Sequence, residues 1–173
     1  IEWSIQAMDL DTRETVEVAA IQDRPGSVVI DDGVVVWSEA SGSQTGTNTI
    51  RGLDLTTGTP LEIVSGDEHV YTLAISGSTL AWHARETWDI SHLRLRNIAT
   101  LTPAETVVTI RSADSGAGTR GVELMAVQGQ RLFWQEGFEI PSDPGNYHSR
   151  VLIQTRGEDE PTVLASGDAT RFA

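Results

Sequence analysis

Three segments of the chain repeat one pattern, in which an aliphatic residue stands seven positions before a Trp and a short Gly-containing turn lies between them. The segments are 29–37, 74–82 and 126–134, so that Trp82 follows Trp37 by 45 positions and Trp134 follows Trp82 by 52. An internal repeat of this length is typical of a unit that buries its apolar face only by stacking on a copy of itself. We therefore expect the three Trp side chains to fill the core between neighbouring units.

The repeat extends beyond each Trp. Residues 93–107 repeat the pattern of residues 50–64, with Asn97 at the position of Asp54. Asp9 stands 45 positions before Asp54 and matches it in the repeat. Side-chain acceptors at such positions bond the backbone amides that follow them in a turn. We expect Asp9, Asp54 and Asn97 to be turn residues rather than catalytic groups.

The apolar residues alternate with polar ones, and no stretch of the chain carries the spacing of an amphipathic helix. The alternating stretches are rich in Val, Ile and Thr and are bounded by Gly, Asp and Pro, which indicates short strands. Four antiparallel strands every 40 to 50 residues describe a β-propeller blade. We predict an all-β chain in which residues 1–173 form a single propeller segment of about three and a half blades. The propeller is then either incomplete or completed by a partner. Its expected parts are outer strands over residues 4–19, blades over about 26–65, 68–111 and 121–166, and the start of a further strand over 167–173.

One stretch of the repeat is specific enough to compare with known proteins. Three Val and a Trp at 34–37, a polar loop, and the pattern Ile-x-x-Leu-Asp-Leu-x-Thr-Gly at 50–58 resemble the blades of the TolB-like or WD40-like (PD40) bacterial propeller superfamily. The resemblance implies a secreted or periplasmic scaffold that binds peptides or sugars or, with an extra domain, takes part in hydrolysis. The Gly-His and Trp-Asp dipeptides of eukaryotic WD40 blades are not repeated here.

Composition excludes several classes of function. Twelve basic against 25 acidic residues give a net charge of -13, which repels phosphate backbones and makes nucleic acid an unexpected partner. The chain has no Cys, and so no disulfide or thiolate metal site, and it has no apolar run long enough for membrane insertion. Since strand-like sequence starts at once after Ile1, we expect a processed segment of an extracellular or periplasmic protein.

The longer connections of the predicted blades all emerge at one end of the strands, and the short Gly turns emerge at the other. Loops on a rigid scaffold carry function, so the long-loop end is the candidate binding surface. Trp88 and Tyr147 lie outside the repeat, and they either cap a blade edge or contact a ligand. The candidate ligand-binding residues are Arg85, Glu86, Trp88, Arg120, Phe138, Glu139, Asp143 and Tyr147.

The remaining residues with possible chemistry form no specific pattern. The four His residues, His69, His83, His92 and His148, occupy inequivalent positions in the repeat and have no adjacent carboxylate triad, so we expect neither a metal site nor another cofactor. The Gly-x-Ser-x-Gly motif of serine hydrolases is absent.

Two functions fit these observations. The first is a non-catalytic exported module that binds a protein, peptide or glycan through its long-loop end or spaces other domains. The alternative is the propeller part of an enzyme, either a metal-dependent lyase or the gating domain of a serine peptidase whose catalytic parts are elsewhere. Because unpaired blade edges are templates for strand pairing, self-association is a further expectation.

Overall fold

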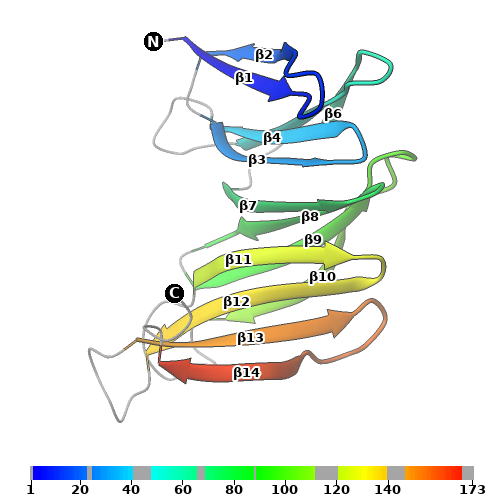
Figure 1. Ribbon diagram of the computed structural model, residues 1–173. Coiled ribbons are helices and arrows are strands. Elements are labelled where there is room, and N and C mark those ends of the chain that lie inside the picture. Colours follow the sequence, from blue (N-terminus) through cyan, green and yellow to red (C-terminus); the bar gives the residue numbers. More distant parts are fainter. Residues whose placement is uncertain are drawn as a thin grey trace. The chain divides into compact units, whose positions relative to one another are not determined.

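The computed structural model describes residues 2–22, 25–40, 48–65, 69–87, 89–111, 121–139 and 147–168. Within these ranges, nothing is described of the side chains of Ala40, Asn48, Glu139, Tyr147 and Asp168. Every regular element in the described residues is a β-strand (Figure 1), which confirms the predicted all-β class. No helix in this part of the chain is long and apolar enough to cross a membrane. The chain divides into two compact units, Ile1–Val70 (unit 1) and Tyr71–Ala173 (unit 2).

Unit 1 contains a two-stranded and a four-stranded antiparallel sheet. In the larger sheet the strand order is β3-β4-β5-β6, so strands that are consecutive in the chain are neighbours in the sheet. The strands are β1 (Trp3–Met8), β2 (Thr15–Ile21), β3 (Pro25–Asp31), β4 (Val34–Ala40), β5 (Asn48–Asp54) and β6 (Thr59–Val64).

Unit 2 contains two four-stranded antiparallel sheets with the same simple order, and the first strand begins at the boundary with unit 1. Together with the sheet of unit 1 they are the three predicted blades. The strands are β7 (His69–Ser76), β8 (Thr79–Arg85), β9 (Ile90–Asn97), β10 (Glu105–Arg111), β11 (Gly121–Gln128), β12 (Arg131–Glu139), β13 (Tyr147–Thr155) and β14 (Thr162–Asp168). Gly167 and Asp168, which we expected to begin a further strand, end β14, and residues 169–173 lie outside the described residues.

Short polar turns fix the register of the strands. The predicted turn role of Asp9, Asp54 and Asn97 is confirmed, because each side chain accepts hydrogen bonds from the backbone amides two and three residues later at 2.8–3.1 Å. These bonds lower the pKa of both carboxyl groups. The bond from the Thr12 amide has the largest effect on Asp9, and the bond from the Thr57 amide has the largest effect on Asp54. The turn at Asp9 also explains why β1 ends at Met8.

The hairpins that follow the first strand of each sheet depend on glycine. Gly33, Gly77 and Gly129 have φ angles of +74°, +53° and +57°, a region that residues with a Cβ rarely adopt. Glycine at these positions allows a tight hairpin, so the strands on either side pair without a long loop.

Trp37 anchors the core of unit 1. It is buried together with Val35 against Ile5 and Ile21 of the two-stranded sheet, and Leu53 and other partly buried side chains complete the cluster. The Trp side of the four-stranded sheet is therefore covered by the strands that precede it in sequence.

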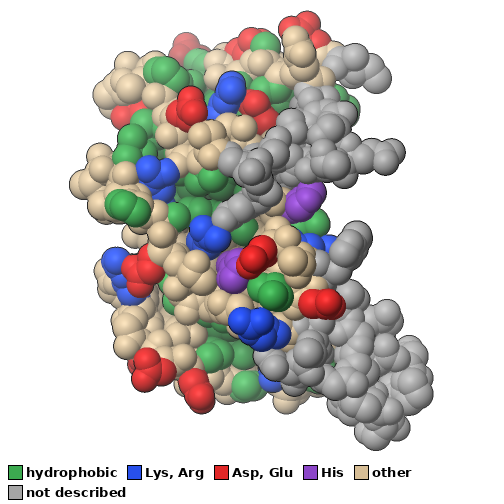
Figure 2. Space-filling model, turned by 180° about the vertical axis from the view of Figure 1, so that it is seen from behind, with side chains coloured by type: hydrophobic (Ala, Val, Ile, Leu, Met, Phe, Trp, Pro, Cys, Tyr) green, Lys and Arg blue, Asp and Glu red, His purple; other side chains and the backbone are tan. Residues whose placement is uncertain are grey.

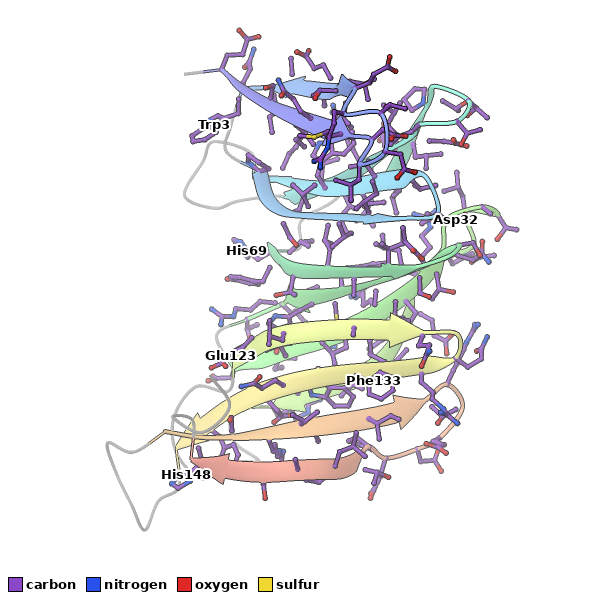
Figure 3. The ribbon with its side chains drawn as sticks, viewed as in Figure 1. Trp3, Asp32, His69, Glu123, Phe133 and His148 are labelled. Carbon is purple, nitrogen blue, oxygen red and sulfur yellow. The ribbon has the colours of Figure 1, made fainter. Side chains whose placement is uncertain are left out.

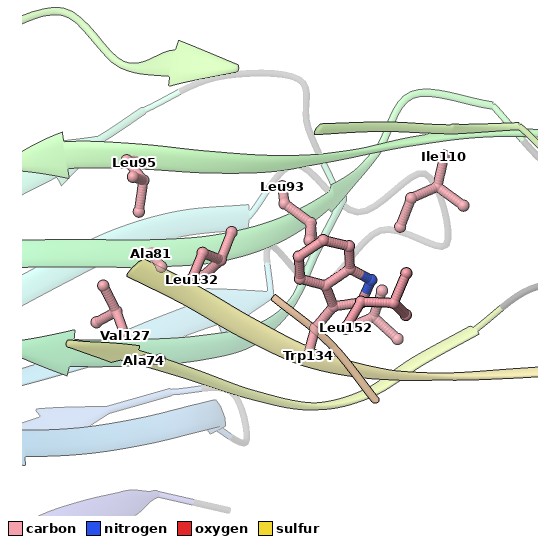
Figure 4. Packing of buried hydrophobic residues seen from close by; sticks show 10 residues of the cluster. Ala74, Ala81, Leu93, Leu95, Ile110, Val127, Leu132, Trp134 and Leu152 are labelled. Carbon is pink, nitrogen blue, oxygen red and sulfur yellow. The ribbon is translucent and has the colours of Figure 1, made fainter. Parts of the chain in front are cut away.

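Trp134 has the same role in unit 2. It lies in a cluster that draws Ala81 and Leu93 from the β7–β10 sheet and Leu132 and Leu152 from the β11–β14 sheet (Figure 4). Trp134 is 2% exposed and Ala81 and Leu93 are 0% exposed. Again the Trp side of one sheet packs on the sheet that precedes it, as predicted for stacked blades.

Candidate ligand-binding site

One end of unit 2 gathers polar and aromatic side chains, and we call it the loop end. Here β8 ends at Arg85 and β9 begins at Ile90, and here β12 ends at Glu139 and β13 begins at Tyr147. Figure 3 shows His148 near this end, at the start of β13. The short Gly turns lie at the opposite end of the same strands, because successive strands are antiparallel.

The β7–β10 sheet contributes an imidazole, a phenol and a guanidinium to the loop end. The ring centroids of Tyr71 and His83 are 5.4 Å apart, and Cζ of Arg85 lies 4.9 Å from the centroid of the Tyr71 ring. The second contact has cation–π geometry. His83 and Arg85 are two residues apart on β8 and therefore share a face of the sheet.

Burial controls the charge of His83. The side chain is 2% exposed, and its burial, with the positive charges of Arg85 and His92, lowers the pKa of His83 from 6.5 to about 4. Neither of its ring nitrogens has a hydrogen-bond partner among the described residues. His83 is thus a neutral imidazole at pH 7, with one donor and one acceptor nitrogen that are both buried.

The β11–β14 sheet contributes a buried carboxylate and a second stacked guanidinium. Glu136, which is 2% exposed, accepts hydrogen bonds from Trp134 Nε1 at 2.9 Å and from Arg150 at 3.1 Å. Cζ of Arg150 lies 5.4 Å from the centroid of the Phe138 ring, and the Phe138 and His148 rings are 6.1 Å apart. This sheet therefore repeats the combination of Arg, His and an aromatic ring.

The same Trp–Glu pair occurs in unit 1, which identifies Glu136 as a structural group. Trp37 Nε1 donates to Glu39 at 2.7 Å, and Glu39 lies 3.8 Å from Nε of Arg51. A carboxylate two positions after the Trp thus satisfies the buried indole in these two blades, whereas the β7–β10 blade has Ala84 at this position and Trp82 Nε1 has no partner among the described residues.

The two polar groups project from faces that pack together. Cross-strand register places His83 and Arg85 on the face of the β7–β10 sheet that carries Leu93, and places Glu136 and Phe138 on the face that carries Trp134. Leu93 and Trp134 belong to one core cluster. We call the polar side chains that continue these two faces toward the loop end the polar layer: Tyr71, His83, Arg85, Glu136, Phe138, His148 and Arg150.

The predicted site residues are brought together only in part. Arg85 and Phe138 belong to the polar layer, whereas Glu86 bonds His92 at 2.7 Å, and His92 lies opposite Ala84 on the other face of the sheet. The backbones of Glu139 and Tyr147 are at the loop end, but their side chains are not described. Trp88, Arg120 and Asp143 lie outside the described residues.

Five residues of the polar layer are absent from the predicted set of ligand-binding residues. Two of them, His83 and His148, were weighed only as metal ligands, and the other three are Tyr71, Glu136 and Arg150. A signal was present for Glu136 and His83, because alternation along the strand places each on the same face as a buried residue two positions earlier. Among the described residues, no group of three or more His, Asp and Glu is arranged to hold a metal ion.

Charge is distributed unevenly along the chain. Residues 1–70 contain three Arg and 13 Asp and Glu, whereas residues 71–173 contain nine Arg and 12 Asp and Glu. The excess negative charge therefore resides mainly in unit 1. Figure 2 shows His side chains with acidic and basic side chains beside them on the surface.

Comparison with known proteins identifies the fold. No protein family matches the sequence, and no curated protein shows significant similarity to it. Among solved structures, an oligogalacturonate lyase in complex with manganese is 18% identical with a TM-score of 0.64, over 96% of this chain and 48% of the lyase. The tricorn protease is 10% identical with a TM-score of 0.62, over 94% of this chain and 20% of the protease.

TolB from Acinetobacter baumannii is also similar, with 13% identity and a TM-score of 0.49 over 94% of this chain and 48% of TolB. The chain thus spans half or less of the length of these proteins. At these identities the likeness establishes the fold alone. The chain has the β-propeller fold, as the resemblance to TolB-like and WD40-like propellers implied.

Proposed function

We propose that the protein is a non-catalytic, exported propeller module that binds an acidic group of a protein, peptide or glycan at the loop end of unit 2. The observation that carries the proposal is the polar layer, in which Arg85 and Arg150 are each held against an aromatic ring. Arg on a rigid scaffold is suited to recognise carboxylate, sulfate or phosphate groups through paired hydrogen bonds.

The neutral His83 places no second positive charge beside Arg85, because burial lowers the pKa of its imidazole to about 4. Tyr71 is 45% exposed and gives a polar ligand an apolar surface to stack on.

The structural role of Glu136 favours binding over catalysis. Its carboxylate is already bonded to Trp134 and Arg150, as Glu39 is bonded to Trp37, so it is poorly placed to exchange protons with a substrate. The alternative, the propeller part of a lyase or peptidase, requires a metal or a catalytic domain. Metal analysis of the protein after incubation with Mn²⁺ tests this alternative. Retention of Mn²⁺ in a stoichiometric amount would favour the lyase.

A matched pair of polymers tests the proposal. Oligogalacturonate and its methyl ester have the same sugar backbone, but only the first carries carboxylates. By calorimetry we expect oligogalacturonate to bind and the ester to bind at least about tenfold more weakly, because a charge-assisted hydrogen bond is worth about 1.5–3 kcal/mol. An acidic peptide and its amidated form extend the test to protein ligands.

Two substitutions locate the site. Arg85→Gln removes a charge from the polar layer, and we expect it to weaken binding about tenfold or more. Arg131→Gln removes a charge from an exposed residue at the opposite end of β12 and should leave binding unchanged. Equal affinity of wild type and Arg85→Gln, or no binding of any acidic probe, would contradict the proposal.

A further inference from the structure

Three side chains form a hydrogen-bonded series on the face of the β7–β10 sheet that is opposite to the polar layer. Nε2 of His92 lies 2.7 Å from a carboxylate oxygen of Glu86, and Nδ1 of His92 lies 3.2 Å from the hydroxyl oxygen of Thr109. His92 on β9 is the cross-strand partner of Thr109 on β10 and of Ala84 on β8, which fixes the face that they share. We call Glu86, His92 and Thr109 the Glu–His–Thr triad.

The backbone of this one sheet positions the triad. The amides of Glu86 and Thr87 donate to the Ile90 carbonyl at 3.0 and 3.1 Å, so a hydrogen-bonded turn after β8 fixes the point from which the Glu86 side chain extends. His92 and Thr109 lie opposite each other in two paired strands, so the strand register fixes the distance between them. The triad is therefore built by one turn and one strand pair.

The two partners of His92 assign its proton. An ionised carboxylate only accepts hydrogen bonds, so Nε2 of His92 donates to Glu86. In a neutral imidazole the other nitrogen is then an acceptor, and Nδ1 of His92 accepts a hydrogen bond from the Thr109 hydroxyl. A hydroxyl that is bonded to a base, with a third group orienting the base, is the arrangement that activates an oxygen nucleophile.

The hydroxyl end of the triad is open to solvent. Thr109 is exposed, whereas the His92 side chain is only 14% exposed. Strand β10 is the edge strand of its sheet, so no strand of that sheet pairs with its outer side. A reagent therefore reaches the Thr109 oxygen while the imidazole that activates it stays largely covered.

The composition of the chain leaves few competitors for this hydroxyl. All 12 basic residues are Arg, and the chain contains neither Lys nor Cys. The amines and thiolates that commonly attack acyl groups are thus missing from its side chains. An acyl donor meets mainly hydroxyl groups and imidazoles, and the Thr109 hydroxyl has an imidazole bonded to it.

We propose that Thr109 is a modification site that takes an acyl group from an ester with a good leaving group, independently of the polar layer. The Thr109 oxygen attacks the acyl carbon and gives its proton to Nδ1 of His92, while Glu86 holds the imidazole that becomes positive. The bond between the acyl carbon and the leaving oxygen then breaks, and the leaving oxygen takes the proton from His92. The products are an acyl ester on Thr109 and the free alcohol.

Acetylation of the 173-residue protein by p-nitrophenyl acetate tests the proposal. The reaction is run at about pH 8, at which an ordinary imidazole is neutral. Cleavage after Arg96 and Arg111 places Thr106 and Thr109 in one peptide, and mass spectrometry of its fragments gives the rate at each Thr. Thr106 is exposed on the same strand but lies opposite Arg94, so it is an internal control. We expect Thr109 to react at least about 100-fold faster than Thr106, as general base catalysis allows.

Substitutions assign the roles within the triad. His92→Gln keeps a polar side chain but removes the base, and we expect acetylation at Thr109 to fall at least about 100-fold. Thr109→Ser keeps a hydroxyl and should retain the reaction, whereas Thr109→Val keeps the shape and should leave the peptide unlabelled at position 109.

Glu86 is a positioning residue, and a spectroscopic measurement tests its role. Glu86→Gln removes the carboxylate that holds the imidazole, and we expect acetylation at Thr109 to fall about tenfold or more. The ¹⁵N NMR signals of the His92 ring should change from those of the form with the proton on Nε2 to those of a mixture of both neutral forms.

Three outcomes would overturn the proposal. The first is equal acetylation of Thr106 and Thr109 in the wild-type protein. The second is an unchanged rate at Thr109 in His92→Gln, because the imidazole is then not the base. The third is acetylation of the same peptide to the wild-type extent in Thr109→Val, because another group is then the nucleophile.

Discussion

His83 and Glu136 are buried polar residues on strand faces that carry core residues. Both are 2% exposed, but only Glu136 has its polar atoms paired, with Trp134 and Arg150. His83 avoids the cost of a buried charge by remaining neutral. At the scale of single residues, the polar layer therefore combines a satisfied structural carboxylate with a neutral imidazole whose buried nitrogens have no hydrogen-bond partner among the described residues.

The lowered pKa of His83 predicts acid sensitivity. The pKa of about 4 in the folded protein lies below the ordinary 6.5, so the unfolded chain binds the extra proton between these values. Stability is therefore fully present above about pH 6.5 and is lost as the pH falls toward 4, by up to about 3 kcal/mol. Urea unfolding at several pH values should show that the free energy of unfolding falls less with acid in His83→Gln than in the wild type. The same dependence of stability on pH in both proteins would contradict the lowered pKa of His83.

The sequence located some functional side chains and missed others for a physical reason. Asp9, Asp54 and Asn97 act within four residues of sequence, so their turn role was predictable. His83 and Arg150 acquire their environment from side chains on the neighbouring strands, Tyr71 for His83 and Glu136 and Phe138 for Arg150. Alternation shows which face they share, but it does not show what lies over that face.

At the scale of elements, each blade is a series of hairpins set by short turns. Gly129 joins β11 to β12 with a φ of +57°, and β12 then pairs with β13 over its full length without a bulge. The pairing of β11 is interrupted by one irregularity, between Val122 and Leu124. The turn and the first register pairs therefore define which residues of β12 face the core.

A pair of glycines tests this role of the turn. Gly129→Ala places a Cβ at a positive φ, and we expect it to lower the free energy of unfolding by about 1 kcal/mol. Gly121, at the start of β11, has no positive φ, and a Cβ added there would meet no described atom within 4 Å. Gly121→Ala should therefore change stability by less than about 0.5 kcal/mol. Equal losses in thermal melts would show that the turn conformation is not the cause.

The strands were predictable because their pattern is local. The three blades were predicted within a few residues, since alternating apolar residues end at Gly, Asp or Pro. Within the predicted outer strands over residues 4–19, Asp9 begins the turn that separates β1 from β2. The predicted start of a further strand at Gly167 was wrong, because β14 continues through Gly167 to Asp168.

At the scale of the molecule, one packing rule operates inside each unit. The Trp side of a sheet lies on the strands before it, Trp37 on the β1–β2 pair and Trp134 on the β7–β10 sheet. The polar layer of unit 2 exists because this packing brings two sheets face to face.

Urea unfolding of two Trp variants tests this rule most directly. Trp134 is 2% exposed between two sheets, so Trp134→Ala should lower the free energy of unfolding by about 3–5 kcal/mol through the lost contacts and the cavity. Trp3 lies outside the repeat pattern and is 41% exposed, so Trp3→Ala should cost less than about 1 kcal/mol. A loss for Trp134→Ala no larger than that for Trp3→Ala would contradict the conclusion that the repeated Trp holds the blades of unit 2 together.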